Sequence, residues 1–174
     1  MNLSLELIDL HWLRDTEEKY DRCAHGRVFL QIGDRIVSDE GSDEWTVSST
    51  AYYFLKYLRR DYLKSEGSPL LPCCGFTFSR MIDDPTQPII FGCPNGIDWQ
   101  ITHKPHHVEH IFDDGYVVDV DFHEWRRQVC KFSDQVKGIY DRSAPKISSD
   151  AEEKEGFDHF MMMWKTYREE ANGY

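Results

Sequence analysis

Three short runs in which apolar and polar residues alternate constrain the fold of this chain more than any other feature. They are residues 97–103, 107–112 and 116–122, and the last two are separated by the turn-forming Asp113–Gly115. A period of two places successive side chains on opposite faces of a strand, and Asp-Gly between two such runs is a strong hairpin signal. The sequence therefore predicts a three-stranded antiparallel meander over residues 97–122.

Apolar residues at helical spacing predict three helices, over about residues 45–64, 123–141 and 149–170. In the second of these, the apolar residues from Trp125 to Ile139 recur at intervals of four and three. That spacing produces one apolar stripe along a helix, which is the side that packs against the rest of a protein. We expect all three helices to bury such a stripe.

Further alternating segments at residues 3–10 and 27–37 add strands before the first helix. The predicted fold class is α+β, with an antiparallel sheet of about six or seven strands, including the meander at 97–122, and three helices packed mainly on one face. A chain of 174 residues is long enough for a real core and indicates a single domain, residues 1–174. Residues 146–174, which contain the last helix, could be an appendage to it.

The beginning of the sequence and the cysteine content indicate a compartment. The first residues carry neither the basic start nor the apolar run of a secretion signal. No apolar stretch approaches the roughly 20 residues that a membrane-spanning helix needs. The five cysteines are an odd number without the spacing of a disulfide framework. We therefore predict a cytoplasmic protein with reduced thiols and no membrane partner.

The charge of the chain bears on the class of its partners. Its formal net charge is −11 at pH 7, and Glu109–Glu124 contains six acidic residues and no lysine or arginine. A nucleic-acid-binding protein needs a basic face, and here only residues 52–64 offer a modest one. The sequence predicts no nucleic-acid partner and favours a basic protein partner. The alternative is that the acids only keep the protein soluble.

A non-catalytic binding protein is the function that these features favour, because the motifs of serine hydrolases, dinucleotide-binding enzymes and kinases are absent. Immunity proteins, which neutralise toxic nucleases, have this general character. The predicted partner-binding residues are Asp113, Asp114, Tyr116, Asp119 and Asp121. The four aspartates would steer the encounter with the partner, and Tyr116 would anchor the complex.

The alternative function is a zinc- or thiol-dependent enzyme that uses three cysteine-bearing turns. The candidate zinc ligands are Cys23, His25, Cys73, Cys74 and Cys93. Their spacing departs from the paired ligands of common zinc motifs, so the site would exist only if the turns met in space. Cys73 or Cys74 could instead be a nucleophile with His25 as its base. The simpler interpretation is that these cysteines are small buried residues at strand ends, and no other cofactor is predicted.

A group of histidines surrounds the first turn of the predicted meander. If residues 104–106 form that turn, His103 and His107 become cross-strand neighbours. Such a pair could hold a metal ion together with Glu109, or it could respond to pH. The alternative is a polar hairpin tip without a specific function.

Overall fold

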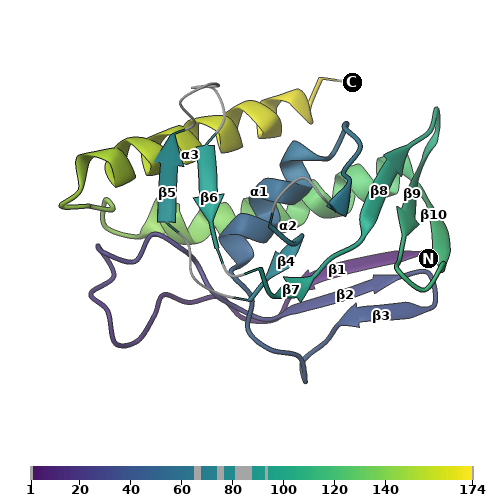
Figure 1. Ribbon diagram of the computed structural model, residues 1–174, viewed down its shortest axis with the longest axis horizontal. Helices are drawn as coiled ribbons and strands as arrows, with labels where there is room; N and C mark the ends of the chain where they lie inside the picture. Colours follow the sequence, from purple (N-terminus) through teal and green to yellow (C-terminus); the bar gives the residue numbers. More distant parts are fainter. Residues whose placement is uncertain (1, 65–67, 74–76, 81–87, 93, 174) are drawn as a thin grey trace.

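The computed structural model describes residues 2–64, 68–73, 77–80, 88–92 and 94–173 (Figure 1). Within these residues the backbone forms ten β-strands and three α-helices. The strands are β1 (Leu3–Leu7), β2 (Val28–Ile32), β3 (Arg35–Ser38), β4 (Leu71–Pro72), β5 (Thr77–Arg80), β6 (Pro88–Phe91), β7 (Gly96–Ile97), β8 (Gln100–His103), β9 (His107–Ile111) and β10 (Val117–Asp121). The helices are α1 (Val47–Lys56), α2 (Phe122–Arg142) and α3 (Ala151–Glu170).

All strand pairs among the described residues are antiparallel, which confirms the predicted α+β class together with its three helices. The strands are divided among separate sheets rather than joined in one. Two sheets have three strands, in the orders β1-β2-β3 and β10-β9-β8, and two ladders pair β4 with β7 and β5 with β6. Figure 1 shows α1 and the β4–β7 ladder between the β5–β6 hairpin and the meander, so these strands do not form one continuous sheet.

The predicted meander is confirmed as strands β8, β9 and β10. Ile101 pairs with His110, and His110 pairs with Val118 on the other side. Because directly opposite residues point to the same face, these three side chains lie together on the inner face, where all three are buried. The turn between β9 and β10 contains Gly115 with a φ of 83°, a conformation that glycine adopts without strain.

The first sheet packs its β2–β3 turn against the meander. Leu5 of β1 lies opposite Leu30 of β2, and both are buried in the core. Gly33 in the turn has a φ of 62°, and a Cβ atom there would lie 2.8 Å from the hydroxyl oxygen of Tyr116. Glycine at this position therefore permits both the turn and the close approach of the two sheets.

Helix α1 is shorter than predicted, because it ends at Lys56 rather than near residue 64. Beyond it residues 57–60 form a turn and bends, and Tyr62 then forms a β-bridge with Ile101 of the meander. The Tyr62 amide donates to the Ile101 carbonyl at 2.8 Å, and the Ile101 amide donates back at 3.0 Å. In this long-range pair the amide and carbonyl groups of Tyr62 bond to Ile101, so they are not available for hydrogen bonds within a longer helix. The apolar residues after Lys56 keep a helical spacing in the sequence, which is why a longer helix was predicted.

The other two helices match their predicted ranges within two residues, and their apolar faces are buried. Helix α2 buries Trp125, Val129, Phe132 and Val136 against α1, β1 and the meander. Helix α3 packs on β5, β6 and α1. None of the helices in the described part of the chain combines the length and the apolar character that a bilayer span requires.

Candidate functional site

The turn between β9 and β10 carries two of the predicted partner-binding acids, and both form ion pairs within the chain. The Lys64 ammonium lies 2.6 Å from a carboxylate oxygen of Asp113. The Arg35 guanidinium pairs with the Asp114 carboxylate, and this hydrogen-bonded contact lowers the pKa of that carboxyl. Both acids remain more than half exposed, so these pairs lie on the surface of the protein.

Tyr116, the predicted aromatic anchor, supports the packing between the two three-stranded sheets. Its hydroxyl oxygen accepts a hydrogen bond of 3.1 Å from the Asp34 amide in the β2–β3 turn. The guanidinium of Arg35 lies 4.8 Å from the centre of its ring and 4.5 Å from that of Phe112. Tyr116 is half-buried, so part of the residue remains exposed beside the acidic turn.

Asp119 and Asp121 lie on the outward face of β10, where they alternate with buried valines. The Asp121 carboxylate caps helix α2, because it accepts hydrogen bonds from the amides of His123 at 2.9 Å and Glu124 at 3.0 Å. The Asp119 side chain is 63% exposed, and a carboxylate oxygen lies 3.7 Å from Nε2 of His107. No lysine or arginine among the described residues pairs with Asp119.

The outward face of β9 places two further polar residues beside Asp119. Glu109 lies directly opposite Asp119 in the register, and His107 lies two positions before Glu109 on the same strand. The ligand atoms of these three side chains all lie within 4.8 Å of one another. The proximity of Asp119 to Glu109 was not predicted from the sequence. The signal was present, however, because a hairpin centred on Asp114 pairs residues five positions before it with residues five positions after it.

The structure contradicts the predicted pairing of His103 with His107. His103 pairs with Val108 instead, so the register differs from the predicted one by a single residue. A slip of one residue exchanges the two faces of a strand. The His103 ring lies against the segment that follows α1. Its Nε2 is 2.8 Å from the carbonyl oxygen of Leu58, and its Nδ1 is 3.3 Å from Asp61.

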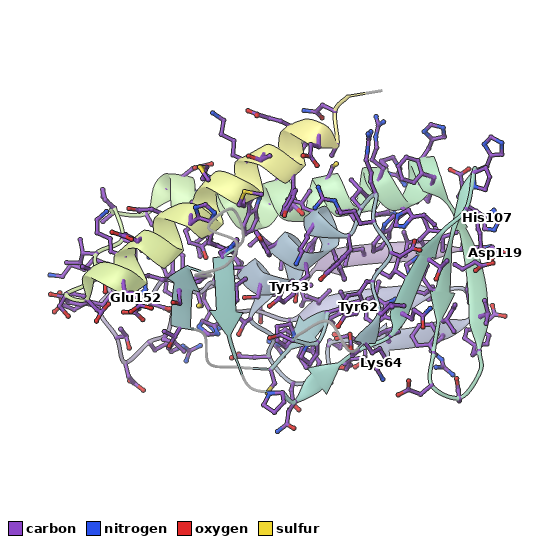
Figure 2. The ribbon with its side chains drawn as sticks, turned by 45° about the horizontal axis from the view of Figure 1, so that its top comes forward. Tyr53, Tyr62, Lys64, His107, Asp119 and Glu152 are labelled. Atoms are coloured by element: carbon purple, nitrogen blue, oxygen red, sulfur yellow. The ribbon has the colours of Figure 1, made fainter. Side chains whose placement is uncertain are left out.

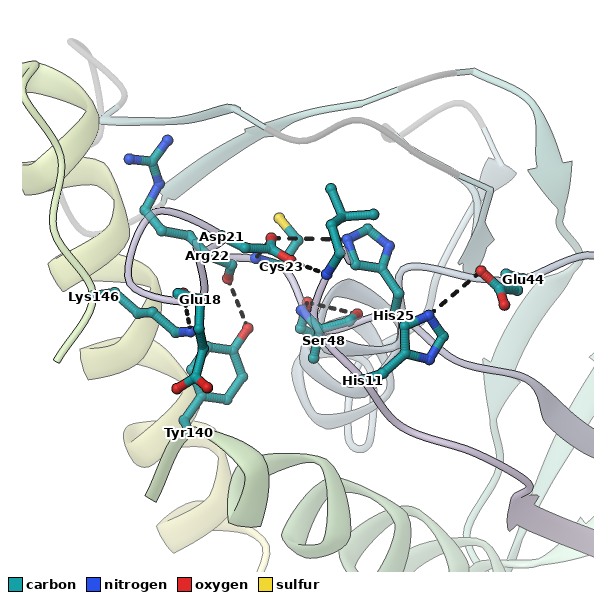
Figure 3. Close-up of polar contacts among 12 residues, drawn as sticks. His11, Glu18, Asp21, Arg22, Cys23, His25, Glu44, Ser48, Tyr140 and Lys146 are labelled. Carbon is teal, nitrogen blue, oxygen red and sulfur yellow. Dashed lines mark hydrogen bonds and ion pairs between the residues drawn. The ribbon is translucent and has the colours of Figure 1, made fainter. Parts of the chain in front are cut away.

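The first cysteine-bearing turn is a structural feature organised by a buried aspartate (Figure 3). The Asp21 carboxylate accepts hydrogen bonds from the amides of Leu13 at 2.7 Å and Cys23 at 3.1 Å, and it lies 3.8 Å from Nε2 of His25. Burial raises the pKa of Asp21, but these interactions outweigh burial and hold it below its usual value. Burial also raises the pKa of the Cys23 thiol well above its ordinary value, which disfavours a nucleophilic thiolate there.

The other predicted zinc ligands are only partly within the described residues. Cys73 is half-buried, and its amide donates to the carbonyl of Asn95 at 3.2 Å. Cys74 and Cys93 lie outside the residues that the structure describes. Within the described ranges, no group of three ligand atoms close enough for one ion includes Cys23, His25 or Cys73. The predicted zinc site therefore gains no support here, and it stays a prediction.

A pocket of about 500 Å³ lies where the β8–β9 turn meets the start of α2. Its lining includes the basic residues Arg59, His103 and Lys104. The His103 ring contacts the Leu58 carbonyl oxygen and Asp61, and the Lys104 ammonium lies 3.1 Å from Glu109. Both His103 and Lys104 are therefore engaged by neighbouring groups of the chain.

A second pocket, of about 480 Å³, contains the half-buried carboxyl of Asp98. Burial raises the pKa of Asp98, and the hydrogen bonds that it accepts act in the opposite direction. The donors are the Leu70 amide at 3.1 Å and the Tyr62 hydroxyl at 3.0 Å. These contacts give the carboxyl a structural role, since they tie the segment before β4 to the residues between β7 and β8.

Comparisons with known protein families, with characterised proteins and with solved structures found no match to this chain.

The predicted site residues differ in how far neighbouring groups already engage them. The Cys23 thiol is buried, and Asp98 accepts two hydrogen bonds from neighbouring groups. The least compensated acidic group among the five predicted contact residues is Asp119. It lies on an edge strand together with the acidic turn, and Figure 2 shows Asp119 and His107 at the same end of the molecule.

Proposed function

We propose that this chain is a non-catalytic cytosolic binding protein that neutralises a basic protein partner, in the manner of an immunity protein. The observation that carries the proposal is the exposed face of edge strand β10. It presents Asp119 and Asp121 beside the acidic turn of Asp113 and Asp114, and Tyr116 lies between the two pairs in the sequence.

The net charge of −11 supports a partner of opposite charge. Complementary charges accelerate association and exclude partners of the wrong sign. A nuclease is the kind of partner that fits, because an enzyme that binds phosphates needs a basic face. An acidic surface can cover that face without performing any chemistry.

The acids on this surface have different roles in the proposed contact. Asp119 makes the main contribution to this contact, because no lysine or arginine among the described residues forms an ion pair with its carboxylate. Asp113 and Asp114 would exchange their pairs with Lys64 and Arg35 for pairs with the partner. Such an exchange has a small cost, since an exposed ion pair contributes only about 0–1 kcal/mol.

An apolar side chain accompanies the acids. Val117 on β10 is 51% exposed, and it occupies the same outward face as Asp119. Interfaces between proteins usually combine a small apolar centre with a polar rim. The combination of the exposed Val117, the half-buried Tyr116 and the surrounding carboxylates therefore suits a protein partner better than a small cation.

The test is an affinity capture with the chain as bait at about 50 mM and about 300 mM salt, followed by binding measurements with the purified captured protein. We expect a basic protein whose affinity falls with added salt. Asp119→Lys should weaken binding by about tenfold or more, since it places like charges in contact.

Asp15→Lys is the matched control, because it makes the same change in net charge in the exposed segment between β1 and β2. Figure 1 shows that segment at the end of the molecule opposite to the meander. The proposal is wrong if Asp119→Lys and Asp15→Lys reduce affinity equally, or if the affinity does not depend on salt. Asp121 is unsuitable for this test because its carboxylate caps α2.

A further inference from the structure

Three side chains on the outer face of the β9–β10 hairpin converge as metal ligands would. His107 and Glu109 alternate on β9, and Asp119 lies on β10 directly opposite Glu109. Each offers one ligand atom, and these atoms all lie within 4.8 Å of one another. Figure 2 shows His107 and Asp119 next to each other at the outer edge of the meander.

The backbone fixes this arrangement more firmly than a loop would. Glu109 is held between β8 and β10, since Thr102 is its partner on one side and Asp119 on the other. The side chains of His107 and Glu109 are 39% and 25% exposed, so an ion from solvent can reach them. Ligands carried by paired strands need little ordering when an ion binds.

The charges at this position favour an added cation. Two carboxylates directly opposite each other on neighbouring strands repel. Nearby compensation comes from the Lys104 ammonium, which lies 3.1 Å from a carboxylate oxygen of Glu109. This is a surface contact of the kind that contributes little to stability, so a divalent ion can replace it.

We propose that His107, Glu109 and Asp119 bind one divalent transition-metal ion. One imidazole nitrogen and two carboxylate oxygens suit zinc, cobalt or manganese, whereas calcium and magnesium prefer oxygen ligands alone. Three protein ligands leave at least one coordination position open to water. The site uses none of the cysteine-bearing turns, and it shares Asp119 with the proposed partner contact.

The test uses the untagged chain, stripped of metal with a chelator and titrated with zinc in a calorimeter and with cobalt in an absorption spectrometer. We expect one equivalent of each ion to bind. His107→Ala, Glu109→Gln and Asp119→Asn should each weaken binding by about tenfold or more, because each removes one of three ligands. The cobalt spectrum should lack the intense near-ultraviolet band of cobalt–thiolate bonds.

Two control variants sharpen the result. His123→Ala removes an exposed histidine of α2 that is outside the group, and it should leave the affinity unchanged. Lys104→Ala removes the cation that competes for Glu109, and it should strengthen binding. The proposal is overturned if His107→Ala and Asp119→Asn bind zinc as the unaltered chain does, if no ion binds, or if a cobalt–thiolate band appears.

The two proposals can fail separately. His107→Ala should weaken metal binding while it retains all the acids, so it should still bind a basic partner. The unaltered chain could bind zinc through these residues while Asp119→Lys binds the partner as tightly as the unaltered chain does. That result would support the metal site and refute the proposed interface.

Discussion

At the scale of single residues, His110 is the most constrained titratable group of the inner face of the meander. It is fully buried, and the Trp99 indole donates a hydrogen bond of 2.9 Å to its Nδ1. That bond requires a neutral ring whose proton is on Nε2, which has no hydrogen-bond partner in the described structure. Burial lowers the pKa of His110 to about 3.

This burial makes stability depend on pH in a defined direction. The unfolded chain protonates His110 near its ordinary pKa of about 6.5, whereas the folded chain does so only near pH 3. Between these values the unfolded state binds more protons, so the stabilisation is complete above about pH 6.5 and is lost as the pH falls toward 3.

We predict that the free energy of unfolding falls by on the order of 1 kcal/mol per pH unit between about pH 6 and pH 5. His110→Gln should flatten this slope, although it lowers stability at neutral pH, and His123→Gln should leave the slope unchanged. Urea unfolding, followed by circular dichroism at several pH values, measures how the free energy of unfolding depends on pH. Equal slopes in the unaltered chain and His110→Gln would show that His110 is not the responsible group.

At the scale of elements, the contact between α3 and β5 depends on a glycine. A Cβ atom at Gly156 would lie 2.5 Å from the backbone carbon of Phe78 and 2.5 Å from the backbone nitrogen of Ser79. Backbone atoms cannot move aside as a flexible side chain can. The helix can therefore approach the strand closely only without a side chain at this position.

We predict that Gly156→Ala lowers the free energy of unfolding by about 1–3 kcal/mol, even though alanine favours helices, because the clash forces the helix away from the strand. Gly138→Ala in α2 is the matched control. Its Cβ atom would meet only the movable end of Arg142 at 2.9 Å, so this change should stabilise by up to about 1 kcal/mol. Thermal unfolding of both variants measures the difference, and a stabilised Gly156→Ala would contradict the close approach.

The sequence was most informative where a pattern depends on neighbours along the chain. The alternation of the meander and the stripe from Trp125 to Val136 are local signals, and both correspond to observed elements. The end of α1 was missed because it depends on Tyr62 pairing with the distant Ile101. Propensity and periodicity carry no information about such a partner.

In the candidate sites too, features set by neighbours along the chain could be predicted, and features set by distant segments could not. The five predicted contact residues are on one hairpin because a short turn keeps them together. Their ion pairs with Arg35 and Lys64 come from distant segments, so the partial compensation of Asp113 and Asp114 could not be predicted. Whether the cysteine-bearing turns meet also depends on distant segments, and Cys74 and Cys93 lie outside the described residues.

At the scale of the whole molecule, α1 lies at the centre of an aromatic core. Phe54 of α1 is 5.4 Å from Trp125 of α2 and 6.0 Å from Trp99, measured between ring centres. On the other side, Tyr52 is 5.0 Å from Phe160 and 5.7 Å from Tyr167 of α3. The last helix therefore completes the core around α1 in addition to covering β5.

We predict that removal of residues 146–174 prevents cooperative folding, because it exposes Tyr52 and Phe78, which α3 covers. The near-ultraviolet circular dichroism should decrease strongly, and thermal unfolding should lose its sharp transition. A truncated chain that keeps both signals would show that the helix is an appendage to a self-sufficient domain.

The pairing of β4 with β7 affects where the chain can tolerate insertions and deletions during evolution. Leu71 pairs with Ile97 and Pro72 with Gly96, so the segment that carries β5 and β6 leaves and rejoins the body at one point. An insertion or deletion between these ends could lengthen or shorten the segment without displacing the meander. The apolar face of α3 packs against that segment, with Phe157 and Phe160 near Phe78. Relatives of this protein that differ in this segment should therefore also differ in the residues of α3 that pack against it.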